Sequence, residues 1–332
     1  MHPASPESHP FVPRRGLGGG HLQTLAGNFL KRKNHLPEPE ERLFHVEPEV
    51  QVLCDCHWQR DRSRTLTLMI VHGLEGSSDS QYVVGTGSKA WERGWNVIRM
   101  NIRNCGGTEG LTPTLYHSGL SGDIRAVIDA LLKQDGLPHI ALAGFSMGGN
   151  QVLKCVGEWG REAPSQMVAA CAVSPACDLA LSADALHRGQ NRIYEWWFLA
   201  GLFKRFRRKA EMFPGRFDPA LLKGVRSIRD FDERITAKYM GFLGAEDYYT
   251  KASSSRVLDK IATPTLVIHA VDDPFVVISD GTAAKLRSNS NITYVESAHG
   301  GHCAFLAAAD GYDGRWAERQ IVDFCTKQLP SR

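Results

Sequence analysis

The chain has 332 residues, of which 42% are apolar and 23% are charged, and its formal net charge is +3. This is the composition of an ordinary globular protein, and it excludes a chain too polar to bury a core. The charge is too small to indicate a nucleic acid as partner. No apolar run approaches the roughly 18 residues that a membrane-spanning helix needs.

The first thirteen residues are rich in proline, histidine and serine and have no apolar centre, so we do not expect a signal peptide. Without such a signal, the eight cysteines of a long chain are expected to be reduced, and the location cytoplasmic. Cys54 and Cys56 are separated by one residue, and no second pair stands at zinc spacing. We interpret them as small packing residues and expect neither a metal nor a cofactor.

From Val52 onward, short β-rich segments alternate with helical ones. The apolar runs predict strands at residues 66–71, 95–100, 139–143, 168–174, 265–271 and 291–295. Helical patterns cover residues 82–93, 120–134, 150–159 and 315–328. Such alternation predicts an α/β fold with a mostly parallel, doubly wound sheet.

The alternation of strands and helices stops between residues 178 and 261, where only helical patterns occur. We therefore expect an inserted helical cap at residues 178–255, a core made of residues 41–177 and 256–332, and an N-terminal arm at residues 1–40. Inside the cap, the aromatic run 196–203 precedes five cations at 204–209. This stretch could contact an acyl chain or an anionic membrane surface. The alternative is a helix that packs on the core with solvated charges.

Gly144-Phe145-Ser146-Met147-Gly148 lies between a predicted strand and a predicted helix. The G-x-S-x-G pattern alone is a weak signal, but in this position it describes a nucleophile elbow. The tight turn requires glycine beside the serine, because glycine has no Cβ that could clash. The pattern predicts Ser146 as a nucleophile. The alternative is a glycine-rich turn with an incidental serine.

A serine nucleophile needs a base that takes its proton. Four histidines follow Ser146 in the chain: His187, His269, His299 and His302. His187 lies in the predicted cap, and His269 lies inside an apolar strand. We favour His302 as the base, because the two glycines before it permit a sharp approach to the elbow. His299 is the alternative.

The base needs an acid that orients it. Asp272-Asp273-Pro274 follows the penultimate predicted strand, and we favour Asp273, with Asp272 capping the loop or solvated. Asp178, which follows an earlier strand, is the rival.

Backbone N–H groups must stabilise the oxyanion that the reaction forms. We expect these groups to belong to Met147, which follows the nucleophile, and to Leu74 in the loop His72-Gly73-Leu74-Glu75-Gly76. His72 precedes Ser146 in the chain, and we interpret it as an anchor of that loop. The turn-rich stretch Asn101 to Thr108 could line the pocket or could simply be a tight connection.

Several motifs together resemble those of the α/β-hydrolases, and more narrowly the YheT-like esterase branch (α/β-hydrolase family 4). They are His21-Leu22-Gln23-Thr24, His72-Gly73-Leu74-Glu75-Gly76-Ser77, Arg103-Asn104-Cys105-Gly106-Gly107-Thr108, Tyr116-His117-Ser118-Gly119, the elbow with Gly149-Asn150, Asp247-Tyr248-Tyr249, Asp272-Asp273-Pro274-Phe275 and Gly300-Gly301-His302. The resemblance extends from about Phe11 to Gln328. It implies an α/β-hydrolase fold and the relay Ser146, Asp273 and His302.

The resemblance also implies a carboxylesterase that acts on short- and medium-chain acyl esters. Relatives include lipid hydrolases and alcohol acyltransferases. We therefore expect a serine hydrolase that uses an acyl-enzyme, with an O-acyltransferase and a non-catalytic binding protein as alternatives. The segment His21-Leu22-Gln23-Thr24 suggests no chemistry, and we expect it to pin the N-terminal arm.

Overall fold

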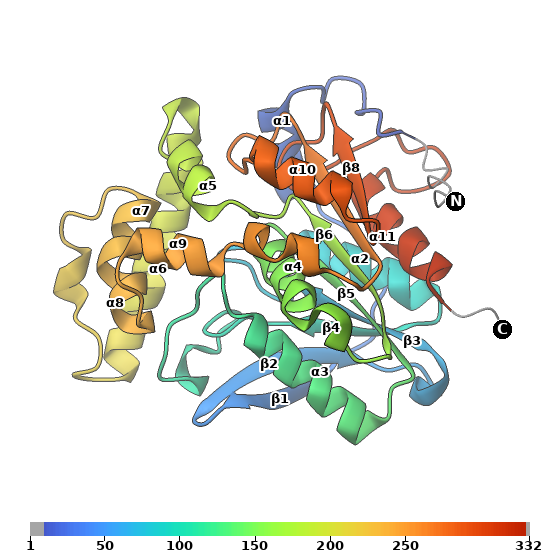
Figure 1. The fold of residues 1–332 in the computed structure, drawn as a ribbon, viewed down its shortest axis with the longest axis horizontal. Helices are drawn as coiled ribbons and strands as arrows, with labels where there is room; N and C mark the ends of the chain where they lie inside the picture. The colour runs from blue at the N-terminus through green and yellow to red at the C-terminus, as the bar shows by residue number, and fades with distance from the viewer. Residues whose placement is uncertain (1–9, 330–332) are drawn as a thin grey trace.

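The computed structural model describes residues 10–329, which form one eight-stranded sheet with helices on both faces (Figure 1). The strands are β1 (Glu40–Glu47), β2 (Val50–His57), β3 (Leu66–Val71), β4 (Asn96–Met100), β5 (His139–Phe145), β6 (Met167–Val173), β7 (Thr265–Ala270) and β8 (Ile292–Ser297). Their order across the sheet is β1-β2-β4-β3-β5-β6-β7-β8. Residues 1–9 of the predicted arm lie outside the described residues.

All pairings from β4 to β8 are parallel, whereas β1 pairs with β2 and β2 pairs with β4 in antiparallel fashion. The prediction of a mostly parallel α/β sheet is therefore confirmed. The six predicted strands correspond to β3 through β8, with ends that differ by at most two residues. These strands were readable because both of their faces are buried, which requires an almost continuous apolar sequence.

The helices are α1 (Gly20–Phe29), α2 (Gln81–Glu92), α3 (Ser121–Asp135), α4 (Met147–Trp159), α5 (Leu179–Leu186), α6 (Arg192–Met212), α7 (Ile228–Phe231), α8 (Ala237–Met240), α9 (Ala245–Ala252), α10 (Asp280–Ser288) and α11 (Trp316–Lys327). Helices α3 and α4 cover one face of the sheet, and α2 and α11 cover the other (Figure 1). Successive residues of one strand alternate between these two layers. Met69 packs with the α3 and α4 side chains, and Ile70 with those of α2 and α11.

Two strands and one helix of the N-terminal region were not predicted. Strand β1 lies at the sheet edge, and most of its side chains are at least partly exposed, so its sequence lacks a clear apolar alternation. Strand β2 carries Cys54 and Cys56, which are both buried in the core as expected of packing residues. All eight cysteines lie among the described residues as buried free thiols.

Between β6 and β7 the chain forms helices α5 to α9 and no strand. These helices gather at one end of the sheet (Figure 1). A π-helical turn, η6 (Asp232–Thr236), joins α7 to α8. Where a cap begins and ends along the chain stays a prediction. Within residues 10–329, no helix combines the length and the apolar character that crossing a bilayer requires.

Candidate active site

Ser146 lies at the turn between β5 and α4, in a strained backbone conformation with φ 54° and ψ −119°. A methyl group on Gly144 would lie 2.3 Å from the carbonyl oxygen of Gly148, and one on Gly148 would lie 2.3 Å from that of His72. Only glycine fits either position, as the sequence pattern predicted. Strain of this kind in a non-glycine residue persists only where the surroundings enforce it, and it is frequent at functional sites.

Asp273 and His302 form a buried hydrogen-bonded pair. The Nδ1 atom of His302 lies 2.8 Å from Oδ2 of Asp273, and the side chains are 12% and 0% exposed. The other carboxylate oxygen, Oδ1, accepts the backbone N–H groups of Phe275 at 3.1 Å and Val276 at 2.9 Å. Three hydrogen bonds therefore fix the carboxylate, and the carboxylate fixes the orientation of the imidazole ring.

The two groups shift one another's pKa. Burial opposes a charged imidazole, but the Asp273 carboxylate outweighs burial and holds the pKa of His302 above its ordinary value. Burial also acts to raise the pKa of Asp273, yet the His302 ring and the Val276 N–H hold it below its ordinary value. The pair therefore favours a proton on His302 and a charge on Asp273.

Ser146 and His302 face a common cavity of about 600 Å³, which also borders helices α1 and α6. The described residues contain no hydrogen bond between Ser146 Oγ and His302 Nε2. Nε2 of His302 lies 3.7 Å from the Cys303 thiol. The ring of His302 packs against Phe275, with 4.3 Å between ring centroids. Catalytic hydrogen bonds often tighten only when a substrate is bound, so a shared cavity is the relevant observation.

The rival residues have other partners. His299 is exposed and lies 3.3 Å from Asp272, while Oδ1 of Asp272 accepts the Gly301 N–H at 2.8 Å. Asp272 therefore caps the loop, as one of the two expectations for it proposed. Asp178 accepts hydrogen bonds from Ser279 N and Thr282 Oγ1 at the start of α10, and neither of these bonds involves His302.

The burial or the contacts of the other histidines also account for their positions. His187 pairs with Glu195 of α6 at 2.7 Å. His269 is buried in β7, and burial lowers its pKa. His72 is fully buried, and burial lowers its pKa to about 4. The two His72 nitrogens contact the carbonyl of Gly73 and the N–H of Ile102, at 2.8 and 3.0 Å. His72 therefore anchors the loop, as expected.

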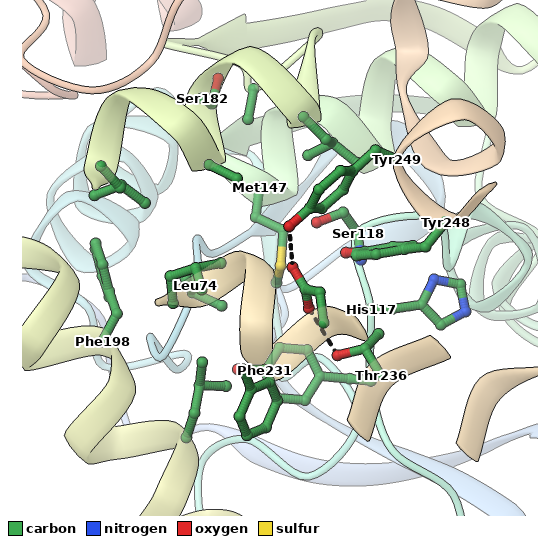
Figure 2. A pocket seen from close by; sticks show the side chains of 18 of the residues that line it. Leu74, His117, Ser118, Met147, Ser182, Phe198, Phe231, Thr236, Tyr248 and Tyr249 are labelled. Atoms are coloured by element: carbon green, nitrogen blue, oxygen red, sulfur yellow. Dashed lines mark hydrogen bonds between the residues drawn. The ribbon is translucent and has the colours of Figure 1, made fainter. Parts of the chain in front are cut away.

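A second, smaller chamber of about 120 Å³ also reaches Ser146, and its lining includes both expected oxyanion donors, Leu74 and Met147 (Figure 2). Gly73 packs so closely on the elbow that a methyl group there would lie 3.1 Å from Ser146 Cβ. The loop that carries Leu74 is therefore next to the serine. That the N–H groups of Leu74 and Met147 bind an oxyanion stays a prediction.

A family model described as "alpha/beta hydrolase fold" matches residues 67–309. The chain belongs to the α/β-hydrolase family. It is 32% identical over 328 residues to YheT of Escherichia coli (strain K12), a protein whose name describes it as an esterase. The match covers 97% of this chain and 94% of YheT. The resemblance to the YheT-like branch, inferred from the motifs, is thereby confirmed.

Two further similarities extend this finding. The chain is 28% identical over 313 residues to a Saccharomyces cerevisiae protein named medium-chain fatty acid ethyl ester synthase/esterase 2, covering 85% of this chain and 67% of that protein. Among solved structures, the Pyrococcus furiosus esterase Pf2001 matches with a TM-score of 0.56 and 14% identity, covering 87% of this chain and 92% of that one. At such low identity, the second similarity concerns the fold alone.

The segment His21-Leu22-Gln23-Thr24 of this α/β-hydrolase contacts the loop that carries His302. Thr24 Oγ1 accepts the backbone N–H of His302 at 2.9 Å and donates to the Gly20 carbonyl at 2.7 Å. A methyl group on Gly301 would lie 2.4 Å from the Gly20 carbonyl oxygen, so the loop and helix α1 are in close contact. The segment pins the arm, as expected, and it also holds the histidine loop. Sequence reasoning missed the second role.

The other residues of the segment contribute further contacts. Gln23 is fully buried, and its side-chain amide exchanges two hydrogen bonds with the backbone of Leu306, at 2.8 and 3.1 Å. His21 stacks on Tyr194 of α6 with 5.7 Å between ring centroids, and its Nδ1 lies 3.1 Å from the tyrosine hydroxyl. Helix α1 thus connects the histidine loop to the helices between β6 and β7.

Three of the five cations in residues 204–209 have protein partners. Arg205 pairs with Glu75 at 3.1 Å, Arg208 pairs with Glu109 at 3.1 Å, and Lys209 donates to the Glu109 carbonyl at 2.9 Å. The expectation of solvated charges is wrong for Arg205 and Lys209, which are largely buried, whereas the Arg208 side chain is still 43% exposed. The other two cations are exposed, and contact with an anionic membrane stays a prediction.

Replacing Thr24 with valine should lower the reactivity of Ser146, because the buried N–H of His302 loses its acceptor and the loop can shift. A displacement of about 1 Å can cost roughly a hundredfold in rate, so we expect a decrease of about ten- to a hundredfold. The rate of labelling by a fluorophosphonate, followed by mass spectrometry, measures this. Thr24→Ser keeps the hydroxyl and should retain most of the rate. Equal rates for Thr24→Val and wild type would contradict the role of Thr24.

Proposed function

We propose that Ser146, His302 and Asp273 form a catalytic triad that hydrolyses carboxylic esters through an acyl-enzyme. The chain is a hydrolase of carboxylic esters, in keeping with relatives that are named esterases. One observation carries the triad. The imidazole of His302, held by Asp273 at 2.8 Å, borders the cavity that also contains the elbow serine.

In the proposed first half-reaction, Ser146 Oγ attacks the ester carbonyl carbon while Nε2 of His302 takes the hydroxyl proton. The carbonyl electron pair moves to oxygen, and the N–H groups of Leu74 and Met147 stabilise the negative charge. The intermediate then breaks the bond to the alcohol oxygen. His302 returns the proton to this leaving group, and the acyl group stays on Ser146.

In the proposed second half-reaction, a water molecule attacks the acyl carbon and gives its proton to His302. Collapse of the second intermediate releases the acid and returns the proton to Ser146. Asp273 keeps Nδ1 of the ring protonated throughout, so that Nε2 is the nitrogen that exchanges protons. The buried carboxylate also stabilises the imidazolium that forms transiently in each half.

The preference for short- to medium-chain acyl groups is part of the proposal. It is supported by the smaller chamber beside Ser146, which has a volume of only about 120 Å³ and is lined mainly by apolar side chains. A pocket of this kind favours a compact apolar group over a long one. No metal or cofactor has a role in these steps.

Replacing Ser146 with alanine should abolish hydrolysis of 4-nitrophenyl butyrate and octanoate. Loss of a triad nucleophile lowers kcat by a factor of about 10⁴ or more. Release of nitrophenolate measures this, and Ser165→Ala, at an exposed serine, is the matched control. Equal turnover by wild type and Ser146→Ala would refute the acyl-enzyme. A fluorophosphonate that labels wild type at Ser146 would dismiss the non-catalytic alternative.

Replacing Asp273 with asparagine should lower the rate and shift its pH dependence. His302 must be neutral to act as base, so activity falls as the pH drops through the pKa of His302, which Asp273 raises. Without the carboxylate, burial dominates, so the pKa of His302 should fall below its ordinary value of 6.5 and the acidic limb should move to lower pH. The maximal rate should drop by about 10⁴.

The measurement is kcat/KM of the residual activity as a function of pH. Asp272→Asn is the control. Asp272 pairs with the exposed His299, so the acidic limb of the pH profile of this variant should stay where it is in the wild type. An acidic limb that is unchanged in Asp273→Asn would show that another group governs it.

An alcohol acyltransferase is the second candidate, because the yeast relative is named both a synthase and an esterase of ethyl esters. Transfer uses the same acyl-enzyme, but an alcohol replaces water in the second half-reaction. We expect free acid to remain the main product when ethanol or hexanol is added to an octanoate ester, as measured by gas chromatography. Ester as the main product at low alcohol concentration would favour transfer.

A further inference from the structure

The smaller chamber beside Ser146 contains one carboxylate in largely apolar surroundings. Asp232 lies in the π-helical turn η6 and is only 8% exposed. Its two oxygens accept the hydroxyls of Thr236 at 2.7 Å and Tyr249 at 2.8 Å (Figure 2). Both donors are neutral. In the described part of the chain, no ion pair joins Asp232 to a cation.

The charge of Asp232 is therefore poorly compensated. Arg229 is the cation that favours its ionised form, but the guanidinium of Arg229 is already bound to Asp184 at 2.8 Å and to Glu246 at 3.1 Å. Burial raises the pKa of Asp232 to about 6, because apolar surroundings disfavour the charged form. A buried carboxylate with two hydrogen bonds retains free lone pairs and favours a further donor.

A second buried acceptor lines the same chamber. Asn104 is 1% exposed, and its side-chain oxygen has no hydrogen-bond partner among the described residues. The amide nitrogen donates to the Thr114 carbonyl at 3.0 Å, which fixes the oxygen as the free end. An unpaired buried acceptor costs about 1–3 kcal/mol. One buried acceptor without a donor and one buried carboxylate with only neutral donors therefore border the same chamber, although they come from distant parts of the chain.

We propose that this chamber binds the part of the substrate that carries a hydrogen-bond donor on a short apolar chain, and that Asp232 selects for that donor. The donor is a hydroxyl or an ammonium group. The apolar lining accommodates the chain, Asp232 and Asn104 accept from its polar end, and a carboxylate at that end is repelled by Asp232. This inference rests on the proposed function, because the chamber is relevant through its contact with Ser146.

A purely structural role for Asp232 would have a different signature. Its bond to Tyr249 joins η6 to α9, and its bond to Thr236 lies within η6, so removing both would lower stability and weaken the binding of all ligands alike. A selective role changes the ratio between ligands that differ only at one end. The ratio is therefore the quantity to measure.

The test uses the full wild-type chain as the parent, since none of the ligands contains an ester bond that Ser146 could cleave. Calorimetry compares hexan-1-ol with hexane-1,6-diol, 6-aminohexan-1-ol and 6-hydroxyhexanoate, and the butane and octane analogues vary the length. We expect the diol or the amino alcohol to bind at least about tenfold more tightly than the monoalcohol, and the hydroxy acid to bind most weakly. Preference for the diol alone would identify a hydroxyl as the donor, and preference for the amino alcohol an ammonium.

Adding Asp232→Leu should reduce this ratio to about one, and Asp232→Asn should abolish the advantage of the amino alcohol. Glu233→Gln, at the exposed neighbouring carboxylate, is the matched control and should keep the ratio. A ratio near one in the parent, or a ratio that survives in both Asp232 variants, would overturn the inference. Should Asp232→Leu fail to fold, Asp232→Asn decides through the lost charge: the amino alcohol should lose its advantage and 6-hydroxyhexanoate its disadvantage, and persistence of both would overturn the inference.

Failure of the proposed function would look different. If the wild type hydrolyses no ester while the binding ratio holds, the triad is wrong and the donor-binding chamber stands. If Ser146-dependent hydrolysis occurs while the ratio is near one at every chain length, the chamber is wrong and the esterase stands.

Discussion

The hydrogen bond between His302 and Asp273 is the interaction on which the rest of the site depends. It joins two residues from loops that follow neighbouring parallel strands, β7 and β8, and it lies almost entirely out of water. Each partner is secured from its other side. Backbone N–H groups fix the carboxylate, and Thr24 holds the backbone of the histidine. A buried charge with this many contacts has little freedom to rotate, which is what positional control of a proton acceptor requires.

The elbow serine lies between two hollows of different character. The larger, of about 600 Å³, lies between α1 and α6 and contains His302, whereas the smaller, of about 120 Å³, extends toward η6 and α9. The helices between β6 and β7 contribute to both. The strand ends thus carry the proposed reactive groups, while the helices between β6 and β7 line both hollows next to them. This division is the usual one in folds that support many chemistries.

The sequence predicted the sheet well because buried parallel strands must be apolar on both faces, as Leu66–Val71 illustrates. The elbow was predicted equally well. Only glycine fits on either side of Ser146, and the two glycines can be recognised in a single sequence. Strand β1 was not predicted, because the exposed side chains of an edge strand give its sequence little apolar alternation. The contact between Thr24 and His302 could not be predicted from the sequence either. The two residues are 278 positions apart, and a threonine hydroxyl can bond to many different groups. Asp232 was missed as well, because its burial depends on how η6 packs against α9, which the sequence pattern does not show.

The 278-residue separation also has a kinetic meaning. During synthesis from the N-terminus, helix α1 emerges early, yet its partner loop appears only after almost the whole chain has been made. Contacts between such distant segments form late, because closing a long loop is entropically costly. The elbow can therefore take shape before His302, the proposed base, is in position. Competence as a catalyst would be acquired last, so an unfinished or truncated chain would be inert rather than prematurely reactive.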